Sequence, residues 1–404
     1  MLLQKPAFLL FYHARAAEAS FGEWLGVLWH GLSLDCTVAG YVTAFPVLVV
    51  LASFWIPLSQ RVWRIILTVY FSLIALVTAA IFAVDLNLYG YWGFRLDGSV
   101  LIYLSDPGEA LASASWGEVL RQILIMLVYA GAMIWSYRWI LRLFRVEPVP
   151  LRGRVVPTVA ALLIGGLTFL AIRGGVTVAT ANVSKVYFSS NMFLNHAATN
   201  PVFSFLSSVG DNENYAEAYP FFEEERRKSL FEELRGNRPG ADAGTPRLLR
   251  SGRPNVVLIL LESFGRTIMD ETVNGEPVMP NMQRFKREGV WFENFFANSF
   301  RTDRGQVAVL CGFPAQTTMS IMKLPRKSAT LPSLARSLGR EGYRSVFMYG
   351  GDLNFTNQAS FMYSTGWEEL IWQKDMQLDA PTSKWGYADD VVVDLFGDEV
   401  KALG

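Results

Sequence analysis

Residues 255–264 read Asn-Val-Val-Leu-Ile-Leu-Leu-Glu-Ser-Phe, a short apolar run that ends on the carboxylate of Glu262. A run this short, with polar residues on both sides, is typical of a strand buried in a parallel sheet. Open α/β sheets bind their ligands at the carboxyl ends of such strands. Glu262 is therefore predicted to lie at a ligand site, where its oxygens suit a divalent ion such as Mn, Mg or Zn.

A second polar motif follows further along the chain, where residues 299–305 read Ser-Phe-Arg-Thr-Asp-Arg-Gly. The hydroxyl of Thr302 stands between Arg301 and Arg304, just before a helix expected at Gln306–Leu310. A hydroxyl at a helix N-terminus beside cations suits an oxyanion or a phosphate. A helix cap is the structural alternative for Thr302, and surface ion pairs are the alternative for the two arginines.

The rest of this region alternates between helix and strand patterns. Helices are expected at Met279–Glu288, Pro332–Glu341 and Tyr387–Leu403, and further strands at Val290–Phe296 and Ser345–Tyr349. Alternating strands and helices predict a three-layer α/β domain with a mostly parallel sheet. We assign residues 254–404 to this domain.

The first part of the chain has a membrane-protein composition. Over the whole chain 51% of residues are hydrophobic and 18% are charged, and the net charge of zero gives no reason to expect a nucleic-acid partner. Segments long and apolar enough to cross a bilayer define a helical membrane domain at residues 1–172, at about Cys36–Pro57, Ile65–Val84, Val119–Leu141 and Val155–Ile172. Residues 1–12 are apolar but too short to span, so a partial first span is expected there.

The charges between these spans predict their orientation. The short loop at Arg61 and Arg64 and the loop Arg138–Arg154 are basic and should be cytoplasmic, whereas the acidic loop Asp85–Glu118 should face outward. Residues 173–253 then lie outside, as a segment on the membrane surface followed by a charged helix at Glu223–Arg235 and a loop at Asn237–Pro246. His196 falls in this segment and is expected to be structural rather than a metal ligand.

The motifs together resemble the lipoteichoic acid synthase-like proteins of the alkaline phosphatase/sulfatase superfamily. The resemblance covers about residues 255–400 and is carried by Glu262, Thr302 and four further motifs: Gly312-Phe-Pro314, Tyr349-Gly-Gly-Asp352, Phe355-Thr-Asn357 and Met362-Tyr-Ser-Thr-Gly366. It implies a multi-pass protein of a bacterial plasma membrane whose extracytoplasmic domain transfers or hydrolyses phosphodiester headgroups of phospholipids or glycolipids. The oligomeric state is left open.

The resemblance also implies roles for individual residues. Thr302 would be the nucleophile, and Glu262 and Thr302 would bind one or two divalent ions. The substrate-binding residues would be Arg301, Arg304, Asp352, Asn357 and Tyr363. For the last three, turn and capping roles are an equal alternative.

The sequence departs from the family pattern in two places. Gln358 stands where lipoteichoic acid synthases have an Arg that binds glycerol phosphate, which implies a different headgroup. The family completes its metal site with an Asp-His pair and a further His, but His13, His30 and His196 all precede Thr302. We therefore expect a truncated and inactive chain that binds metal weakly. The alternatives are phosphoethanolamine transfer, sulfatase-type hydrolysis, for which Cys311 lacks the expected motif, and a non-catalytic scaffold.

Overall fold

The structure is a computed structural model that describes residues 1–98, 100–101, 115–145, 150–209, 221–236, 252–316 and 319–402. The chain divides into a larger unit, Met1–Asn212 with Val307–Gly404, and a smaller unit, Glu213–Gln306. The loop predicted at Asn237–Pro246 lies outside the described residues, as do parts of the loops Asp85–Glu118 and Arg138–Arg154.

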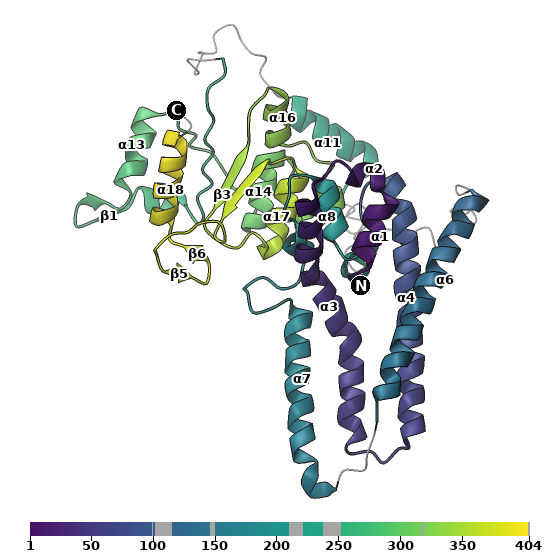
Figure 1. The fold of residues 1–404 in the computed structure, drawn as a ribbon. Coiled ribbons are helices and arrows are strands. Elements are labelled where there is room, and N and C mark those ends of the chain that lie inside the picture. Colours follow the sequence, from purple (N-terminus) through teal and green to yellow (C-terminus); the bar gives the residue numbers. More distant parts are fainter. Residues whose placement is uncertain are drawn as a thin grey trace. The chain divides into compact units, whose positions relative to one another are not determined.

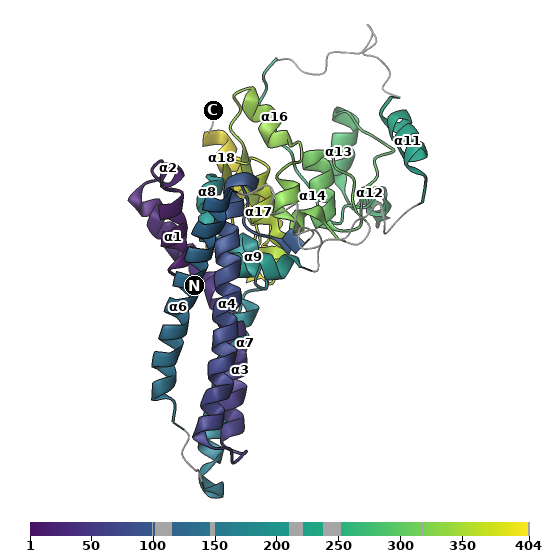
Figure 2. The ribbon, with the colours of Figure 1, turned by 90° about the vertical axis from the view of Figure 1, so that its right-hand side faces the viewer.

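Four long helices of the larger unit correspond to the four predicted spans (Figure 1). They are α3 (Phe21–Ser53), α4 (Gln60–Trp92), α6 (Trp116–Leu143) and α7 (Val155–Arg173). Each has the length and hydropathy needed to cross a membrane. α4 packs against α6 and α3 packs against α7 (Figures 1 and 2). α3 begins earlier than predicted and ends at Ser53, before the predicted Pro57, whereas α4 and α6 extend beyond the predicted spans at both ends.

Capping explains where two of these helices begin. Ser20 before α3 and Ser115 before α6 each form a capping box, in which the serine accepts from the third helical N–H and a glutamate accepts from the serine N–H. The glutamates are Glu23 and Glu118. Each box satisfies two backbone donors that the first turn leaves unpaired.

Short helices pack around one end of α3 and α4. They are α1 (Gln4–Phe11), α2 (His13–Ala16), the 3₁₀ helix η3 (Val183–Val186), α8 (Met192–Ala198) and α9 (Pro201–Ser208). Phe8 of α1 and Leu194 of α8 are fully buried in a cluster with Leu34 and Leu86 of the long helices. Every α8 residue from Phe193 to Ala198 is buried. α8 therefore packs inside the helical cluster, and its polar Asn195 and His196 are hydrogen-bonded there. That the segment lies on a membrane surface stays a prediction.

Buried polar groups join these short helices to the long ones. Lys5 of α1 forms an ion pair of 2.7 Å with Asp35 of α3, and Asn200 donates to the same carboxylate at 2.7 Å. Asp85 of α4 forms an ion pair of 3.1 Å with Arg95. Breaking a buried pair by removing one partner leaves an uncompensated charge, so these contacts fix how the helices meet.

Residues 319–402 of the larger unit contain the regular part of the α/β pattern. Strand β3 (Val346–Tyr349) pairs in parallel with β4 (Glu369–Trp372), and Val346 lies opposite Glu369. The helices around them are α15 (Pro325–Ser328), α16 (Leu334–Arg340), α17 (Gln358–Ser364) and α18 (Asp389–Ala402), with the 3₁₀ turns η4 (Ile321–Lys323) and η5 (Phe355–Asn357). The short strands β5 (Thr382–Ser383) and β6 (Gly386–Tyr387) form a hairpin. The predicted strand at Ser345–Tyr349 and the helices at Pro332–Glu341 and Tyr387–Leu403 are confirmed.

The end of β3 needs its glycines because another backbone passes beside it. The Tyr387 N–H donates to the Gly350 carbonyl at 3.0 Å. A Cβ on Gly386 would lie 2.1 Å from that carbonyl oxygen, and Gly386 has a φ of 113°. Side chains at these positions would separate the β5–β6 hairpin from the strand end.

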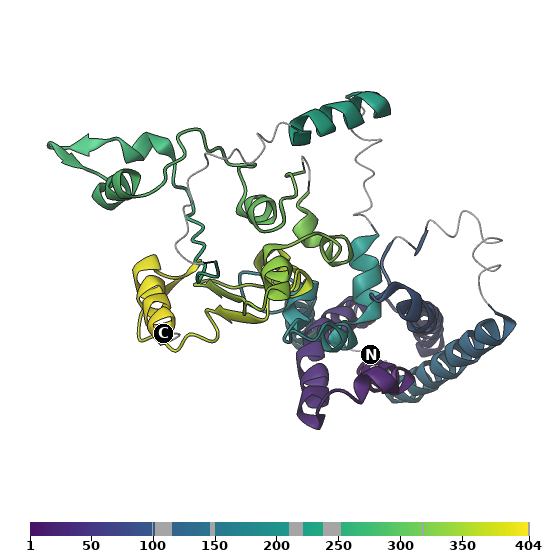
Figure 3. The same ribbon diagram turned by 90° about the horizontal axis from the view of Figure 1, so that it is seen from above.

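The smaller unit contains helices α11 (Glu224–Gly236), α12 (Arg266–Met269) and α13 (Pro280–Glu288). It also contains the hairpin of β1 (Thr272–Val273) and β2 (Glu276–Pro277), which Figure 3 shows together with α12 and α13. The predicted strands at 255–261 and 290–296 are not confirmed. In the described structure neither stretch forms the backbone hydrogen bonds of a β-sheet with a neighbouring strand. Residues 256–261 are 43–63% exposed. An apolar run becomes a strand only when a neighbour supplies backbone partners.

Candidate functional site

A direct hydrogen bond joins the two residues that the sequence places at the centre of the site. The Thr302 hydroxyl donates to Oε2 of Glu262. Both residues belong to the smaller unit, and both side chains are exposed. A hydroxyl and a carboxylate that meet at the surface are accessible to a substrate.

Backbone turns position each of the two side chains. Glu262 is followed by Ser263, whose φ of 59° lies in the left-handed region that few non-glycine residues adopt. The Gly265 N–H donates to the Ser263 carbonyl at 3.0 Å and closes this turn. Strained residues of this kind cluster at functional sites.

Thr302 is the first residue of helix α14 (Thr302–Cys311), which begins earlier than the predicted Gln306. The carbonyl of Arg301 accepts from the N–H groups of Arg304 and Gly305, at 3.1 and 2.9 Å, and so starts the helix. Because the Thr302 hydroxyl donates to Glu262 rather than accepting from a backbone N–H, its contact is not that of a helix cap.

The two predicted arginines differ in accessibility. Arg301 is half-exposed, and its Nε lies 3.4 Å from Oδ1 of Asp303. Arg304 is buried, and its guanidinium lies 5.5 Å from the centre of the Phe300 ring. Arg301 is thus the arginine that an anionic group at Thr302 would meet from solvent.

Glu262 and Thr302 offer the type of ligand that a hard divalent ion prefers, but two side chains are fewer ligands than such an ion needs. A carboxylate and a hydroxyl are suitable oxygen ligands. Within the described ranges, no group of three or more His, Cys, Asp or Glu side chains gathers where it could hold an ion. His196, in α8 of the larger unit, is 4% exposed, and its Nδ1 lies 3.1 Å from the Tyr89 hydroxyl. Its contacts are those of a structural histidine.

Asp352, Asn357 and Tyr363 belong to the larger unit, whereas Glu262 and Thr302 belong to the smaller one. Asp352 accepts from the backbone and side-chain N–H groups of Asn354, at 2.9 and 2.8 Å, which is a turn role. Asn357 precedes α17 with a φ of 65°. It is buried, and its Nδ2 donates to the Lys323 carbonyl at 3.4 Å. Burial raises the pKa of Tyr363 to about 12, so this phenol stays protonated at neutral pH.

A set of contacts that sequence reasoning missed ties this same region to the segment after α7. The Asn182 side chain donates to the Asn354 carbonyl at 2.8 Å, and the Ser360 N–H donates to the Ser184 hydroxyl at 3.0 Å. Burial lowers the pKa of Lys185, while the nearby charge of Asp352 opposes that shift. No local signal marks these pairs, because the partners lie more than 170 positions apart in the sequence.

Comparisons with known proteins match the same part of the chain. Residues 254–402 match the sulfatase family. A phosphoglycerol transferase I from Xanthomonas campestris pv. campestris is 34% identical over 164 residues, which are 37% of this chain and 23% of that protein. Lipoteichoic acid synthase 1 from Bacillus subtilis is 31% identical over 130 residues, covering 29% of this chain and 19% of that protein.

A crystal structure in the alkaline phosphatase superfamily, from Vibrio parahaemolyticus, has 29% sequence identity and a TM-score of 0.30, and the match covers 32% of each chain. The chain spans less than a quarter of the length of the curated relatives it matches. Residues 254–402, which match the sulfatase family, include all the predicted site residues.

Proposed function

We propose that the protein is a membrane phosphotransferase or phosphodiesterase that acts on lipid-linked phosphodiester headgroups through Thr302, because residues 254–402 match the sulfatase family. The observation that carries this proposal is the hydrogen bond from the Thr302 hydroxyl to the Glu262 carboxylate. It puts a nucleophile and a proton acceptor together, and both are exposed. A threonine hydroxyl needs such a neighbour, or a metal ion, to become an effective nucleophile.

The proposed reaction has two steps. In the first step Oγ1 of Thr302 attacks the phosphorus of the lipid headgroup, and the bond from phosphorus to the lipid alcohol breaks. The Glu262 carboxylate is positioned to take the threonine proton and can pass it to the departing lipid alkoxide, which leaves as the alcohol. In the second step a hydroxyl of the acceptor, or water, attacks the phosphorus and gives its proton to the Glu262 carboxylate. The bond from phosphorus to Oγ1 of Thr302 then breaks, and Oγ1 takes up that proton.

In both steps negative charge builds up on the phosphoryl oxygens, and positive groups are needed to stabilise it. Arg301, exposed next to Thr302, can donate paired N–H groups to the phosphoryl oxygens. The alkaline phosphatase/sulfatase superfamily generally uses divalent metals, and Glu262 and Thr302 would supply two oxygen ligands to such an ion. When bound, it would favour ionisation of the hydroxyl and neutralise phosphoryl oxygen charge.

Trapping of the covalent intermediate tests this function. The full chain in detergent is incubated with Mn²⁺ and phosphatidylglycerol, and phosphorylated peptides are identified by mass spectrometry. The expected result is a headgroup phosphoryl adduct on Thr302 that disappears in Thr302→Ala, with only weak formation of the glycerophosphoryl form, because Gln358 replaces the arginine that binds glycerol phosphate. The matched control is Thr267→Ala, an equal truncation at an exposed threonine of the same unit.

Parallel incubations separate the alternatives. A phosphoethanolamine adduct formed from phosphatidylethanolamine would assign a different headgroup to the same nucleophile. Modification at another residue, or modification that persists in Thr302→Ala, would refute the assignment of Thr302.

A further inference from the structure

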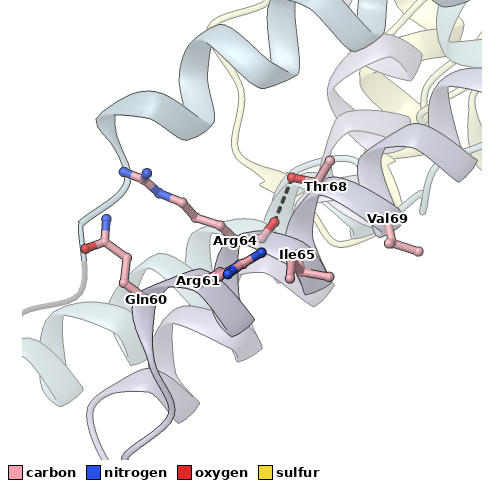
Figure 4. Close-up of a pocket in the computed structure, with 6 residues that line it drawn as sticks. All are labelled: Gln60, Arg61, Arg64, Ile65, Thr68 and Val69. Carbon is pink, nitrogen blue, oxygen red and sulfur yellow. Dashed lines mark hydrogen bonds between the residues drawn. The ribbon is translucent and has the colours of Figure 1, made fainter.

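A cavity lies on α4 at the end remote from α1 and α8. Its volume is about 420 Å³, and Figure 4 shows the side chains that line it: Gln60, Arg61, Arg64, Ile65, Thr68 and Val69. Two of the six are arginines and none is acidic. The cavity lies in the larger unit and shares no residue with the Thr302 site.

The end of α6 holds the Arg64 guanidinium in place. Its Nη2 and Nε donate to the Phe144 carbonyl at 3.0 and 3.3 Å, and Gln60 donates to the same oxygen at 3.3 Å. A guanidinium has five N–H donors, so donors remain for a ligand. The accepting groups are neutral carbonyls, which leave its positive charge uncompensated.

Arg61 adds a second charge one helical turn away. It is exposed, and across the described residues it forms no hydrogen bond or ion pair. Residues three and four apart on a helix share a face, so Arg61, Arg64 and Ile65 present two charges next to an aliphatic side chain. This arrangement attracts an anion.

The cavity continues from these charges onto an apolar surface. Ile65 and Val69 are 52% and 54% exposed on a helix that is long and apolar enough to cross a membrane. They follow Arg61 at intervals of four residues, which forms one stripe along the helix. A ligand that fits both parts has an anionic head and an aliphatic tail.

We propose that this cavity binds the headgroup of an anionic phospholipid. The phosphodiester would lie between Arg61 and Arg64, and an acyl chain would follow Ile65 and Val69. Basic pockets at the ends of membrane helices recognise lipid headgroups in this way, and the planar guanidinium matches the geometry of a phosphate. The bound lipid would hold α4 at the membrane surface, independently of turnover at Thr302.

Lipid titration of the delipidated full chain, followed by native mass spectrometry, tests the proposal. Phosphatidylglycerol should bind more tightly than phosphatidylcholine. A hydrogen bond from a charged donor to the phosphate contributes about a tenfold change in affinity, so Arg61→Gln, which loses that contact, should weaken phosphatidylglycerol binding about tenfold. Because Arg61 is exposed and forms no hydrogen bond or ion pair within the described structure, this variant is expected to fold normally.

The matched control is Arg145→Gln, which removes the same charge from an exposed residue that follows α6 and does not line the cavity. It should leave phosphatidylglycerol affinity within twofold. Equal weakening by both variants would show that only overall surface charge matters and would overturn the proposal. So would equal affinity for the two lipids, or displacement of the lipid by millimolar inorganic phosphate, which would indicate a site for free anions.

Discussion

Single side chains acquire different roles here according to their burial. Thr302 and Glu262 are exposed and meet in a hydrogen bond, which leaves both able to react. His196 is buried against Tyr89, and burial lowers its pKa to about 3. Burial is the largest cause of this lowered pKa, and the charges of Arg95 and Arg15 contribute to the same shift. A neutral imidazole in this place is a structural element of the short-helix cluster rather than a functional base.

This buried histidine should make the fold sensitive to acid. The unfolded chain binds a proton at His196 near pH 6.5, whereas the folded chain does so only near pH 3. The full contribution of His196 is therefore present above about pH 6.5, and it is lost progressively as the pH falls toward 3. Between about pH 7.5 and about pH 5, the loss should be about 2 kcal/mol.

Thermal unfolding of the detergent-solubilised protein at both pH values measures this loss. His196→Gln cannot titrate, and its unfolding midpoint should fall less on acidification than that of the wild type. Tyr89→Phe retains His196 and removes only its hydrogen-bond partner, so its acid sensitivity should persist. Identical pH dependence in the wild type and His196→Gln would mean that His196 is accessible in the folded state.

At the scale of elements, η3 and α17 form the contact that joins the segment after α7 to the α/β region. The Ser184 hydroxyl is 1% exposed and accepts from the Ser360 N–H near the start of α17. Ser360 itself is fully buried. This single bond therefore satisfies a donor that has no access to water.

Ser184→Ala should loosen α17. Removing the acceptor leaves the buried Ser360 N–H unsatisfied, at a cost of about 1–3 kcal/mol. Amide hydrogen exchange across Gln358–Ser364 should accelerate by a factor of about 5–150. Ser207→Ala truncates an exposed serine of α9 and serves as the control. It should leave amide exchange across Gln358–Ser364 unchanged. Unaltered protection of α17 in Ser184→Ala would show that other contacts hold this helix.

The same two elements show how far the sequence could predict the structure. The four long helices follow from local apolar length, and β3 follows from its own residues and from Gly350 and Gly351. The contact of Ser184 with Ser360 depends on partners 176 positions apart, and nothing local indicates it. Residues 255–261 show the opposite case, in which a local pattern predicts a strand that does not form. The described structure places no neighbouring strand beside them to provide backbone hydrogen bonds. The two motifs marked Glu262 and Thr302 separately, and only the family resemblance implied that they act together, as their hydrogen bond now suggests.

At the scale of the whole molecule, charge is distributed unequally between the two ends of the long helices. One end carries Arg61 and Arg64 on α4 and Arg142 on α6, joined by the bonds from Arg64 to the carbonyls of Arg142 and Phe144. Towards the other end, the buried carboxylates of Asp35 and Asp85 are each neutralised by a paired cation, Lys5 and Arg95, so no comparable excess of positive charge gathers there among the described residues. Loops rich in arginine remain on the cytoplasmic side of membranes, so we expect the residues after α7 to lie outside.

Cysteine labelling on either side of α7 tests this orientation. Leu151 precedes the helix and Val176 follows it, with exposed fractions of 73% and 84%. The native Cys36 is exposed and is replaced by serine, whereas Cys311 is buried and reports the background. A membrane-impermeant maleimide applied to intact cells should modify Val176→Cys and should reach Leu151→Cys only after lysis. Labelling of Leu151→Cys alone would invert the orientation and would place the Thr302 site in the cytoplasm, away from lipids of the outer leaflet.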